Sequence, residues 1–339
     1  MAVRMEKDLQ FDPLFWRHGE EISRQLREFE PDVVHITGPS ELGIFGAYFA
    51  WKHGLPLAAS WHTNLHEYAG RRLTWLTRRM PGDSGGRLER GVEAGSLAAT
   101  LRFYRLARVV FAPNVELCTM LEGATGKPCH LMQRGVDTEQ FAPQRRTRSG
   151  DDKGFVLGYV GRLSIEKNVE LLVRIERELA AMGVRGVRFL IVGHGNEEEM
   201  LRRELRAATF AGVLRGDALA EAYANMDLLV FPSHTDTFGN VVLEALASGV
   251  PAVVTPNGGP KFIVRDGESG FVAQDDGFAQ AITGLARDRS RLREMREAAR
   301  VSALGCSWDG VFSRVYAAYE PALAARAERS VLYRRSSPI

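Results

Sequence analysis

The chain of 339 residues carries a formal net charge of +2, and 45% of its residues are hydrophobic and 25% charged. This composition is typical of a globular protein with room for two domains, and the small net charge argues against a nucleic-acid partner. No apolar run reaches the roughly 18 residues of a membrane span, and the early Glu6 and Asp8 do not fit a secretory signal peptide. We therefore expect a cytoplasmic protein.

Short apolar runs alternate with helical segments along most of the chain. Residues 1–30 predict a loop and an amphipathic helix. Four predicted strands follow, at 32–36, 55–60, 108–112 and 129–133. The polar stretch 142–154 predicts a linker, and beyond it six further strands are predicted at 156–160, 188–192, 210–212, 227–231, 251–255 and 270–272. Strict alternation of strands and helices indicates parallel, doubly wound sheets, so the fold class is α/β with two domains and a cleft between them.

The stretch from 229 to 259 places a strand, a polar loop, a short helix and another strand in immediate succession. Asp236 lies in the loop, and Glu244 lies eight positions later, inside the predicted helix. If the helix starts near Gly239, the two carboxylates are separated by ~8 Å along its axis, about the span of a pyrophosphate group. The backbone N–H groups of Phe238, Gly239 and Asn240 then form a seat for phosphate at the positive end of the helix dipole. Spacing alone favours the ordinary explanation, in which Asp236 is a favourable charge near the first turn and Glu244 is an exposed helix residue.

The run from Pro232 to Pro251 reads P-S-H-T-D-T-F-G-N-V-V-L-E-A-L-A-S-G-V-P. It resembles the E-x(7)-E signature of the family 4 retaining glycosyltransferases, which have the GT-B fold of two Rossmann-like domains. The resemblance implies that Asp236 contacts the sugar of a nucleotide-sugar donor, and that the donor is bound by Thr237, Phe238, Gly239, Asn240 and Glu244. Asp236 replaces the usual Glu, which shortens its reach by one methylene and predicts an altered donor-sugar preference.

Arg162 and Lys167 flank the turn GRLSIEKN, directly after the first strand of the second predicted domain. If Ser164 caps the next helix, Lys167 lies in its first turn, where a cation opposes the helix dipole and a bound diphosphate would relieve that conflict. The alternative is a solvated surface pair. The turn also resembles the diphosphate clamp of the family, which implies that both cations stabilise the departing nucleotide diphosphate in catalysis.

Three weaker signals lie outside these motifs. His62 follows the strand 55–60 and resembles the family's cleft histidine beside the donor sugar, which implies a catalytic position. His62 and His66 have metal-like spacing, but no third ligand is evident, and the resemblance implies that neither a metal nor another cofactor is required. The segment FAGVL resembles the family's base-reading segment, so Val213 and Leu214 are donor-binding candidates, although core packing explains them equally well. The run from Gly193 to Gly195 lacks the third glycine of a dinucleotide fingerprint and predicts a structural turn.

The segment from Arg71 to Arg108 contains nine arginines and three acidic residues, a local net charge of +6. On a predicted helix over 65–80, Arg71, Arg78 and Trp75 lie away from the apolar face. Such a face is typical of a helix that binds an anionic membrane surface, and it also occurs on ordinary solvated helices. Both interpretations stay open.

The long matches P-D-V-V-H-I-T-G-P-S and S-W-H-T-N-L resemble mannosyl-, glucosyl- and sulfoquinovosyltransferases that act on lipids. The resemblance therefore implies a retaining transferase that moves a hexose from GDP-mannose or a UDP-hexose to a hydroxyl acceptor, with a lipid as one candidate acceptor and the inner face of the cell membrane as one location. The alternatives are a catalytically weak nucleotide-sugar-binding fragment and a GT-B epimerase. A phosphorylase is disfavoured, because no site for a pyridoxal-phosphate lysine is evident.

The resemblance also predicts the domain limits. Residues 1–147 form the acceptor-side domain and residues 148–309 the nucleotide-sugar domain. Residues 310–339 return to the first domain through Val311, Val315 and Tyr316 of a helix over 308–319. The family's first strand and glycine-rich loop have no counterpart in residues 1–30, so we expect the first domain to be incomplete at its start.

Overall fold

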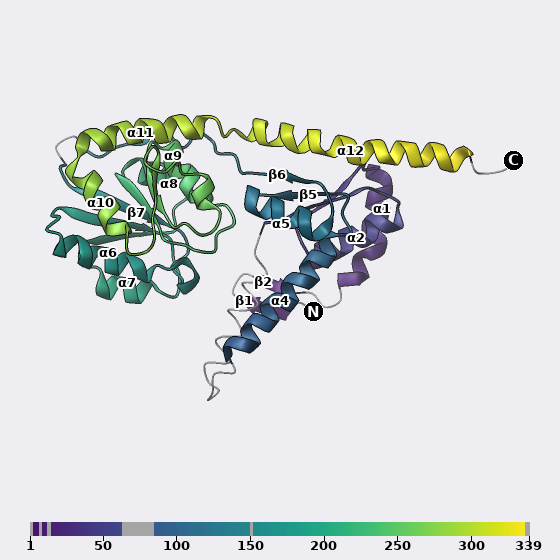
Figure 1. Ribbon diagram of the computed structural model, residues 1–339, viewed down its shortest axis with the longest axis horizontal. Helices are drawn as coiled ribbons and strands as arrows, with labels where there is room; N and C mark the ends of the chain where they lie inside the picture. The colour runs from purple at the N-terminus through teal and green to yellow at the C-terminus, as the bar shows by residue number, and fades with distance from the viewer. Residues whose placement is uncertain (1–2, 7–8, 12–14, 63–84, 150–151, 336–339) are drawn as a thin grey trace. The chain divides into compact units, whose positions relative to one another are not determined.

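The computed structural model describes residues 3–6, 9–11, 15–62, 85–149 and 152–335. The chain forms two compact units: unit 1 comprises Met1–Met132 and Arg314–Ile339, and unit 2 comprises Gln133–Ser313. Each unit contains its own parallel β-sheet with helices packed against it (Figure 1). All ten strands predicted from apolar runs are present, each with ends within about two residues of the expected limits.

Unit 1 is built on a four-stranded parallel sheet in the order β3-β4-β5-β6. These strands are β3 (Val34–Ile36), β4 (Leu57–Ser60), β5 (Val109–Ala112) and β6 (Cys129–Leu131). The helices of unit 1 that precede the boundary are α1 (Gly19–Phe29), α2 (Glu41–Lys52), α4 (Gly85–Tyr104) and α5 (Val115–Thr125). Strands β4 and β5 are buried at every position, which explains why they are continuous apolar runs rather than alternating ones.

The expectation of a loop at the start of the chain is wrong in part. Strands β1 (Val3–Glu6) and β2 (Leu9–Phe11) pair as an antiparallel hairpin that forms a separate two-stranded sheet. A short 3₁₀ turn (Phe15–His18) then leads into α1. Strands of four and three residues alternate too briefly for a two-residue period to be recognised in the sequence.

Helix α12 (Trp308–Arg335) is longer than expected and presents a different face to unit 1. Val315 and Ala318 are buried against Phe111 and its neighbours on the sheet, whereas Tyr316 is 64% exposed. The helical period explains this correction, because residues three to four positions apart share a face and Tyr316 is turned about 100° away from Val315. Tyr319, four positions after Val315, occupies the inward position that was expected for Tyr316. Its hydroxyl is hydrogen-bonded to Nδ1 of His35.

Unit 2 is built on a six-stranded parallel sheet in the order β12-β11-β10-β7-β8-β9. Its strands are β7 (Phe155–Val160), β8 (Val187–Val192), β9 (Ala208–Gly212), β10 (Leu228–Phe231), β11 (Ala252–Val254) and β12 (Gly270–Val272). Its helices are α6 (Glu170–Ala181), α7 (Glu198–Glu204), α8 (Gly216–Ala224), α9 (Asn240–Ala247), α10 (Phe278–Arg287) and α11 (Arg289–Leu304).

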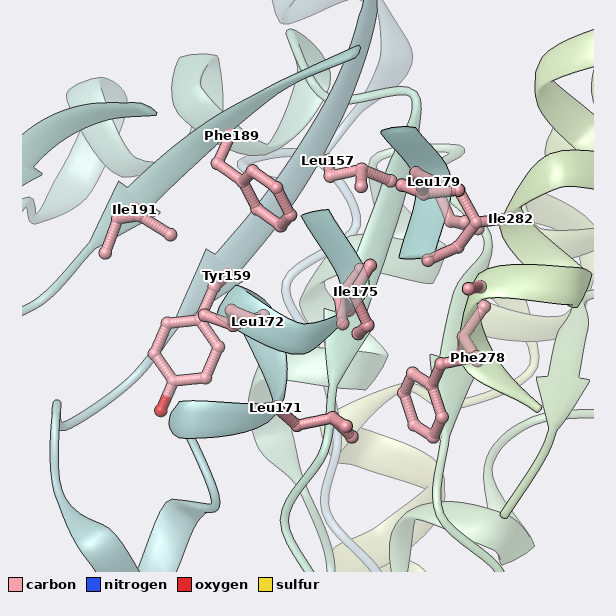
Figure 2. Packing of buried hydrophobic residues seen from close by; sticks show 14 of the residues in the cluster. Leu157, Tyr159, Leu171, Leu172, Ile175, Leu179, Phe189, Ile191, Phe278 and Ile282 are labelled. Atoms are coloured by element: carbon pink, nitrogen blue, oxygen red, sulfur yellow. The ribbon is translucent and has the colours of Figure 1, made fainter. Parts of the chain in front are cut away.

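Two apolar clusters cover the two faces of this sheet. On one face, Leu157 and Phe189 pack with residues of α6, α7, α10 and the first half of α11, and Figure 2 shows Ile175, Phe278 and Ile282 meeting there. On the other face, α8, α9 and the second half of α11 pack over the sheet. Because both faces are covered, the sheet ends are the parts of the unit where polar loops gather.

The predicted linker 142–154 is wrong, because the boundary between the units lies at Met132 and Gln133. Phe141 belongs to the core of unit 2. Arg146 and Arg148 bind the carboxylate of Asp227 at 3.1 and 2.7 Å, and that carboxylate also accepts the N–H of Val156 at 2.9 Å. Burial alone would raise the pKa of Asp227, but the N–H group and the arginines more than offset it and hold the pKa below its ordinary value. The segment looks like a linker in sequence because its polar side chains bind partners far along the chain.

Among the helices that the structure describes, none combines the length and the apolar character needed to cross a membrane.

Candidate functional site

The order of the strands in unit 2 marks one place where a ligand is expected. The chain runs from β7 through β8 to β9 on one side of the sheet, and then starts again at β10 and continues through β11 to β12 on the other side. The loops that follow β7 and β10 therefore diverge in opposite directions at the carboxyl end of the sheet. Such a switch point is where open parallel sheets bind their ligands. Lys167 follows β7 and Asp236 follows β10.

Lys167 and Asp236 meet at this switch point. The ammonium Nζ of Lys167 lies 2.7 Å from Oδ1 and 2.8 Å from Oδ2 of Asp236, and both side chains are only 20% exposed. An ammonium has three donors and each carboxylate oxygen accepts more than one hydrogen bond. The pair can therefore bind a further polar ligand through the third donor of Lys167 and the remaining lone pairs of Asp236.

The local structure around Lys167 differs from the expectation. Ser164 accepts no capping hydrogen bond, and the turn after β7 is a short 3₁₀ helix (Ile165–Lys167) that precedes α6. Lys167 is thus the last residue of that turn and does not lie in the first turn of an α-helix. Its charge is balanced by Asp236 instead of being opposed by a helix dipole. Asn168 follows in a left-handed conformation with φ of 53°, which ends the turn.

The loop that carries Asp236 is anchored by neighbouring loops. The side-chain amide of Asn168 donates to the carbonyl oxygen of Pro232 at 3.2 Å and to Oδ2 of Asp275 at 3.1 Å. His234 Nε2 lies 3.1 Å from Oδ1 of Asp275, and Asn257 Nδ2 lies 3.1 Å from His234 Nδ1. Residues that follow β7, β10, β11 and β12 thus converge on one network, which restrains the position of the Asp236 carboxylate.

Two glycines bring the loop after β11 against this same segment. The N–H of Gly259 donates to the carbonyl oxygen of Asp236 at 2.6 Å. A Cβ at Gly258 would lie 2.6 Å from that oxygen, and a Cβ at Gly259 would lie 2.0 Å from the carbonyl oxygen of Thr237. Gly258 and Gly259 therefore allow the loop after β11 to pack closely against the protein's own loop after β10.

Helix α9 begins at the end of this loop. Gly239 occupies the N-cap position with φ of 102°, a conformation that favours glycine, and no side chain caps the helix. Asn240, the first helical residue, is exposed. Phe238 is only 8% exposed and packs in the core, so it offers a ligand its backbone and not its ring. The first N–H groups of the helix are oriented outward along its axis, as an anion site requires.

Glu244 lies in the fifth position of α9, and it is held by a residue that the sequence does not reveal. The hydroxyl of Tyr223, on α8, donates to Oε2 of Glu244 at 2.7 Å. Burial raises the pKa of Glu244, and the hydrogen bond from Tyr223 partly offsets that rise. The pKa of Tyr223 is itself raised, first by burial and then by the negative charge of Glu244.

Arg162 is placed more loosely than Lys167. Its side chain is 62% exposed, and its nearest carboxylate oxygen, on Glu166, is 3.7 Å away. The backbone carbonyl of Arg162 accepts a hydrogen bond of 2.8 Å from the hydroxyl of the buried Tyr159. This contact restrains the backbone at Arg162 and leaves its guanidinium exposed.

The remaining candidates of unit 2 have different surroundings. Val213 is 63% exposed, whereas Leu214 is partly buried against the core. A Cβ at Gly193 or at Gly195 would lie about 2 Å from a backbone carbonyl oxygen, at 1.8 and 2.1 Å respectively. These two glycines therefore permit close packing of loops, in agreement with the structural turn predicted there.

His62 belongs to unit 1, where it follows β4. A hydrogen bond of 2.7 Å joins its Nε2 to the Oγ of Ser60, the last residue of that strand. The carbonyl oxygen of Ser60 accepts a further hydrogen bond from the buried Tyr104 at 2.9 Å. His62 is thus half-buried at the carboxyl end of the first sheet, with its ring restrained by the strand.

Some of the predicted features fall outside the described residues. His66, Arg71, Trp75 and Arg78 belong to this part of the chain, as does the whole of the helix predicted over 65–80. Among the residues that the structure does describe, no group of three or more His, Cys, Asp or Glu side chains is arranged to hold a metal ion.

Comparison with known proteins finds one family in each half of the chain. The family described as Glycosyltransferase Family 4 matches residues 3–140, and the family described as Glycosyl transferases group 1 matches residues 154–288.

Similar proteins cover most of the chain. The GDP-mannose-dependent alpha-mannosyltransferase of Mycobacterium tuberculosis is 34% identical over 307 residues, which span 88% of this chain and 75% of that protein. The sulfoquinovosyl transferase SQD2 of Arabidopsis thaliana is 29% identical over 89% of this chain and 59% of its own length. Among solved structures, Anabaena HepE in complex with UDP has a TM-score of 0.65 at 18% identity, covering 89% of this chain and 82% of that one.

Proposed function

Because this chain belongs to the group 1, family 4 glycosyltransferases and has their GT-B fold, we propose that it transfers a hexose from a nucleotide diphosphate sugar to a hydroxyl acceptor with retention of configuration. The proposed donor is GDP-mannose, with a UDP-hexose as the alternative. GDP-mannose is favoured because the mannosyltransferase of M. tuberculosis, at 34% identity, is named for its dependence on it.

One observation carries the proposal: the Lys167–Asp236 pair lies at the switch point of the second sheet, between strands β7 and β10. A cation and a carboxylate held 2.7 Å apart match the two parts of a nucleotide sugar that need recognition at the reacting bond. The cation complements the diphosphate oxygens, and the carboxylate accepts hydrogen bonds from sugar hydroxyls.

The other candidates extend this arrangement along the donor. Glu244 accepts hydrogen bonds from the ribose hydroxyls, and the backbone around Thr237, Gly239 and Asn240 binds the diphosphate at the start of α9. The backbone after β9, at Val213 and Leu214, contacts the base. Arg162 adds a second cation at the diphosphate, and its exposure leaves the guanidinium available for that contact. His62, after β4, keeps its proposed role as a contact to the donor sugar.

In the proposed reaction the acceptor oxygen forms a bond to the anomeric carbon while the bond from that carbon to the diphosphate oxygen breaks. The leaving diphosphate takes the acceptor proton on the same face of the sugar, so neither a protein nucleophile nor a metal is required. Lys167 and Arg162 stabilise the negative charge that develops on the diphosphate. Asp236 fixes the sugar of the donor. Because its side chain is short, we expect a donor preference that differs from that of family members that have Glu at this position.

Product analysis tests this function. The protein is incubated with GDP-mannose, UDP-glucose and related donors, together with sugar, polyol and lipid acceptors, and the anomeric configuration of each product is determined by NMR. We expect an α-linked product from an α-linked donor. An epimerised nucleotide sugar would favour the epimerase alternative, and tight donor binding without any product would favour a catalytically weak nucleotide-sugar-binding protein.

An apolar acceptor is supported by the surface of α2. Trp51 is 79% exposed, and Ile44 and Tyr48 are both about half exposed on the same face, at 49% and 48%. A cavity of about 480 Å³ lies between this helix and α1 and is lined by Trp16, Phe45 and Lys52 among others. Aromatic side chains beside a cation are typical of surfaces that contact lipid headgroups and acyl chains. We therefore propose a lipid acceptor and a peripheral location on the inner face of the cell membrane.

Vesicle flotation tests the lipid proposal. The double variant Tyr48→Ser and Trp51→Ser is expected to lose most of its association with vesicles of phosphatidylglycerol and phosphatidylcholine. Val301→Ser on α11 provides the matched control, because Val301 is a 67% exposed apolar residue of unit 2. Equal flotation of the double variant and the unchanged protein would contradict a role for α2 in lipid contact.

A further inference from the structure

Tyr223 and Glu244 form a contact between two helices of unit 2. Tyr223 lies near the end of α8 and is fully buried, whereas Glu244 lies on α9 and is only partly buried. The hydroxyl of Tyr223 donates to Oε2 of Glu244 at 2.7 Å. A single hydrogen bond therefore links a side chain inside the core to the carboxylate proposed to bind ribose.

The tyrosine ring is itself held in place by the core. The ring of Phe141 meets it edge-on, with centroids 5.6 Å apart and an interplanar angle of 82°. The carbonyl oxygen of Phe141 accepts a hydrogen bond of 2.9 Å from Arg300, whose guanidinium also donates to the last residue of α9, Ala247. Because a buried aromatic ring has few accessible rotamers, the Tyr223 hydroxyl oxygen is held in place beside Glu244.

This donor has two consequences for the carboxylate. It fixes one oxygen of Glu244, so less side-chain freedom is lost when a ribose binds to the other oxygen. It also stabilises the charged form against the burial that raises the pKa of Glu244. Among the described residues, Tyr223 is the titratable group that influences this pKa.

We propose that Tyr223 is a positioning residue for nucleotide binding, which acts by holding the Glu244 carboxylate charged and oriented toward the ribose hydroxyls of the donor. This inference rests on the proposed function, because it takes Glu244 as the ribose ligand. Tyr223 itself is buried behind Glu244 and does not contact the nucleotide.

The first test measures the affinity of the full-length protein for GDP-mannose and UDP-glucose by calorimetry at pH 7. Tyr223→Phe keeps the ring and removes only the hydroxyl, and we expect it to weaken binding about tenfold, which corresponds to the loss of one hydrogen bond to a charged group. Tyr319→Phe is the matched control, since Tyr319 is a partly buried tyrosine of α12 whose hydroxyl is hydrogen-bonded to Nδ1 of His35, and neither residue is proposed to bind the donor. We expect its affinity to match that of the unchanged protein.

The second test separates positioning from a structural role by following the same affinity from pH 8 to pH 5. Nucleotide sugars lack a terminal phosphate that titrates in this range, so the profile reports groups of the protein. Protonation converts the carboxylate of Glu244 to a neutral carboxyl, which is a weaker acceptor for the ribose hydroxyls, and affinity therefore falls as the pH falls. Without the Tyr223 hydroxyl the pKa of Glu244 rises further, so the fall in Tyr223→Phe should begin at a higher pH. Glu244→Gln removes only the carboxyl of Glu244, so its affinity should lack the part of the pH dependence that comes from Glu244.

The double variant completes the experiment. If Tyr223 acts through Glu244, adding Tyr223→Phe to Glu244→Gln should weaken binding by much less than tenfold. A Tyr223→Phe protein with unchanged affinity and an unshifted profile, or fully additive effects in the double variant, would overturn the positioning role while the proposed function stands. Unchanged binding by Glu244→Gln alone would instead remove Glu244 from the ribose site and overturn the inference together with that assignment.

Discussion

Lys167 and Arg162 belong to the same turn after β7, but the structure gives them different surroundings. Lys167 is 20% exposed and makes two short contacts to Asp236, whereas Arg162 is 62% exposed and lies 3.7 Å from Glu166. A partly buried carboxylate that loses its cation is left with an uncompensated charge, while an exposed guanidinium can be removed at little cost in stability.

We therefore predict that Lys167→Ala lowers both turnover and stability, whereas Arg162→Ala lowers turnover alone. Loss of either cation removes a group that stabilises developing charge, with an expected decrease in kcat of roughly 100-fold. The free energy of unfolding should fall by roughly 1–3 kcal/mol in Lys167→Ala and by less than about 0.5 kcal/mol in Arg162→Ala. Steady-state kinetics and urea unfolding measure the two effects.

The double variant Lys167→Ala and Asp236→Asn serves as a control, because it removes both charges of the pair. It should recover part of the stability lost in Lys167→Ala without recovering turnover. Full activity in Arg162→Ala would exclude a role for its guanidinium in transfer.

At the scale of elements, strand β3 is joined to helix α12 by His35 and Tyr319. The His35 ring stacks on Phe111 with centroids 5.2 Å apart, and its Nε2 has no hydrogen-bond partner among the described residues. Burial lowers the pKa of His35 to about 4 from an ordinary value of 6.5. The neutral ring is therefore the form that packs between the strand and the helix.

This shift predicts the pH dependence of the stability of unit 1. The unfolded chain binds a proton at His35 more readily than the folded chain does, so the contribution is fully present above about pH 6.5 and is lost as the pH falls toward 4. When this contribution is lost completely, the free energy of unfolding of unit 1 decreases by roughly 3 kcal/mol. Pulsed hydrogen exchange in urea, read at peptides from β4 and β5, measures it at pH 7 and pH 5.

His35→Gln is the matched control, because glutamine keeps a polar group toward Tyr319 and does not titrate. Its stability should vary less between pH 7 and pH 5 than that of the unchanged protein. Equal variation in the two proteins would assign the pH dependence to other groups.

At the scale of the whole molecule, every candidate donor-binding residue except His62 belongs to unit 2. Ligand binding stabilises the part of a protein that forms the site, by about 2.7 kcal/mol at a ligand concentration 100 times Kd. We predict that saturating GDP-mannose or UDP-glucose slows hydrogen exchange most strongly in α9 and in the segments that follow β7 and β10. In unit 1 the slowing should be confined to the segment at the end of β4.

Mass spectrometry of peptides from the full-length protein measures this pattern, and Glu244→Gln at the same ligand concentration provides the control. Slowing that is strongest in α2 and absent from α9 would place the nucleotide in unit 1 and contradict the proposed site.

The sequence by itself determined where the strands lie along the chain and which part of the chain carries the candidate site. Parallel strands covered on both faces are rich in continuous apolar runs, so the ten parallel strands could be located before their neighbours were known. The family was recognisable because the run from Pro232 to Pro251 joins a strand end, a helix start and two acids within one short segment. Local patterns of this kind depend only on residues close together in the chain.

Only the tertiary structure decided which side chains meet. Asn168 binds Asp275, and Glu244 accepts a hydrogen bond from Tyr223, although these partners are 107 and 21 positions apart. Phe141 joins the core of unit 2 although it lies just before a stretch that resembles a linker. The physical reason is that the order of the strands within each sheet and the packing of the helices bring such residues together. Neither produces a periodic pattern of residues that can be recognised in the sequence. The candidate site residues could be proposed from their motif, whereas the residues that hold them in place could not.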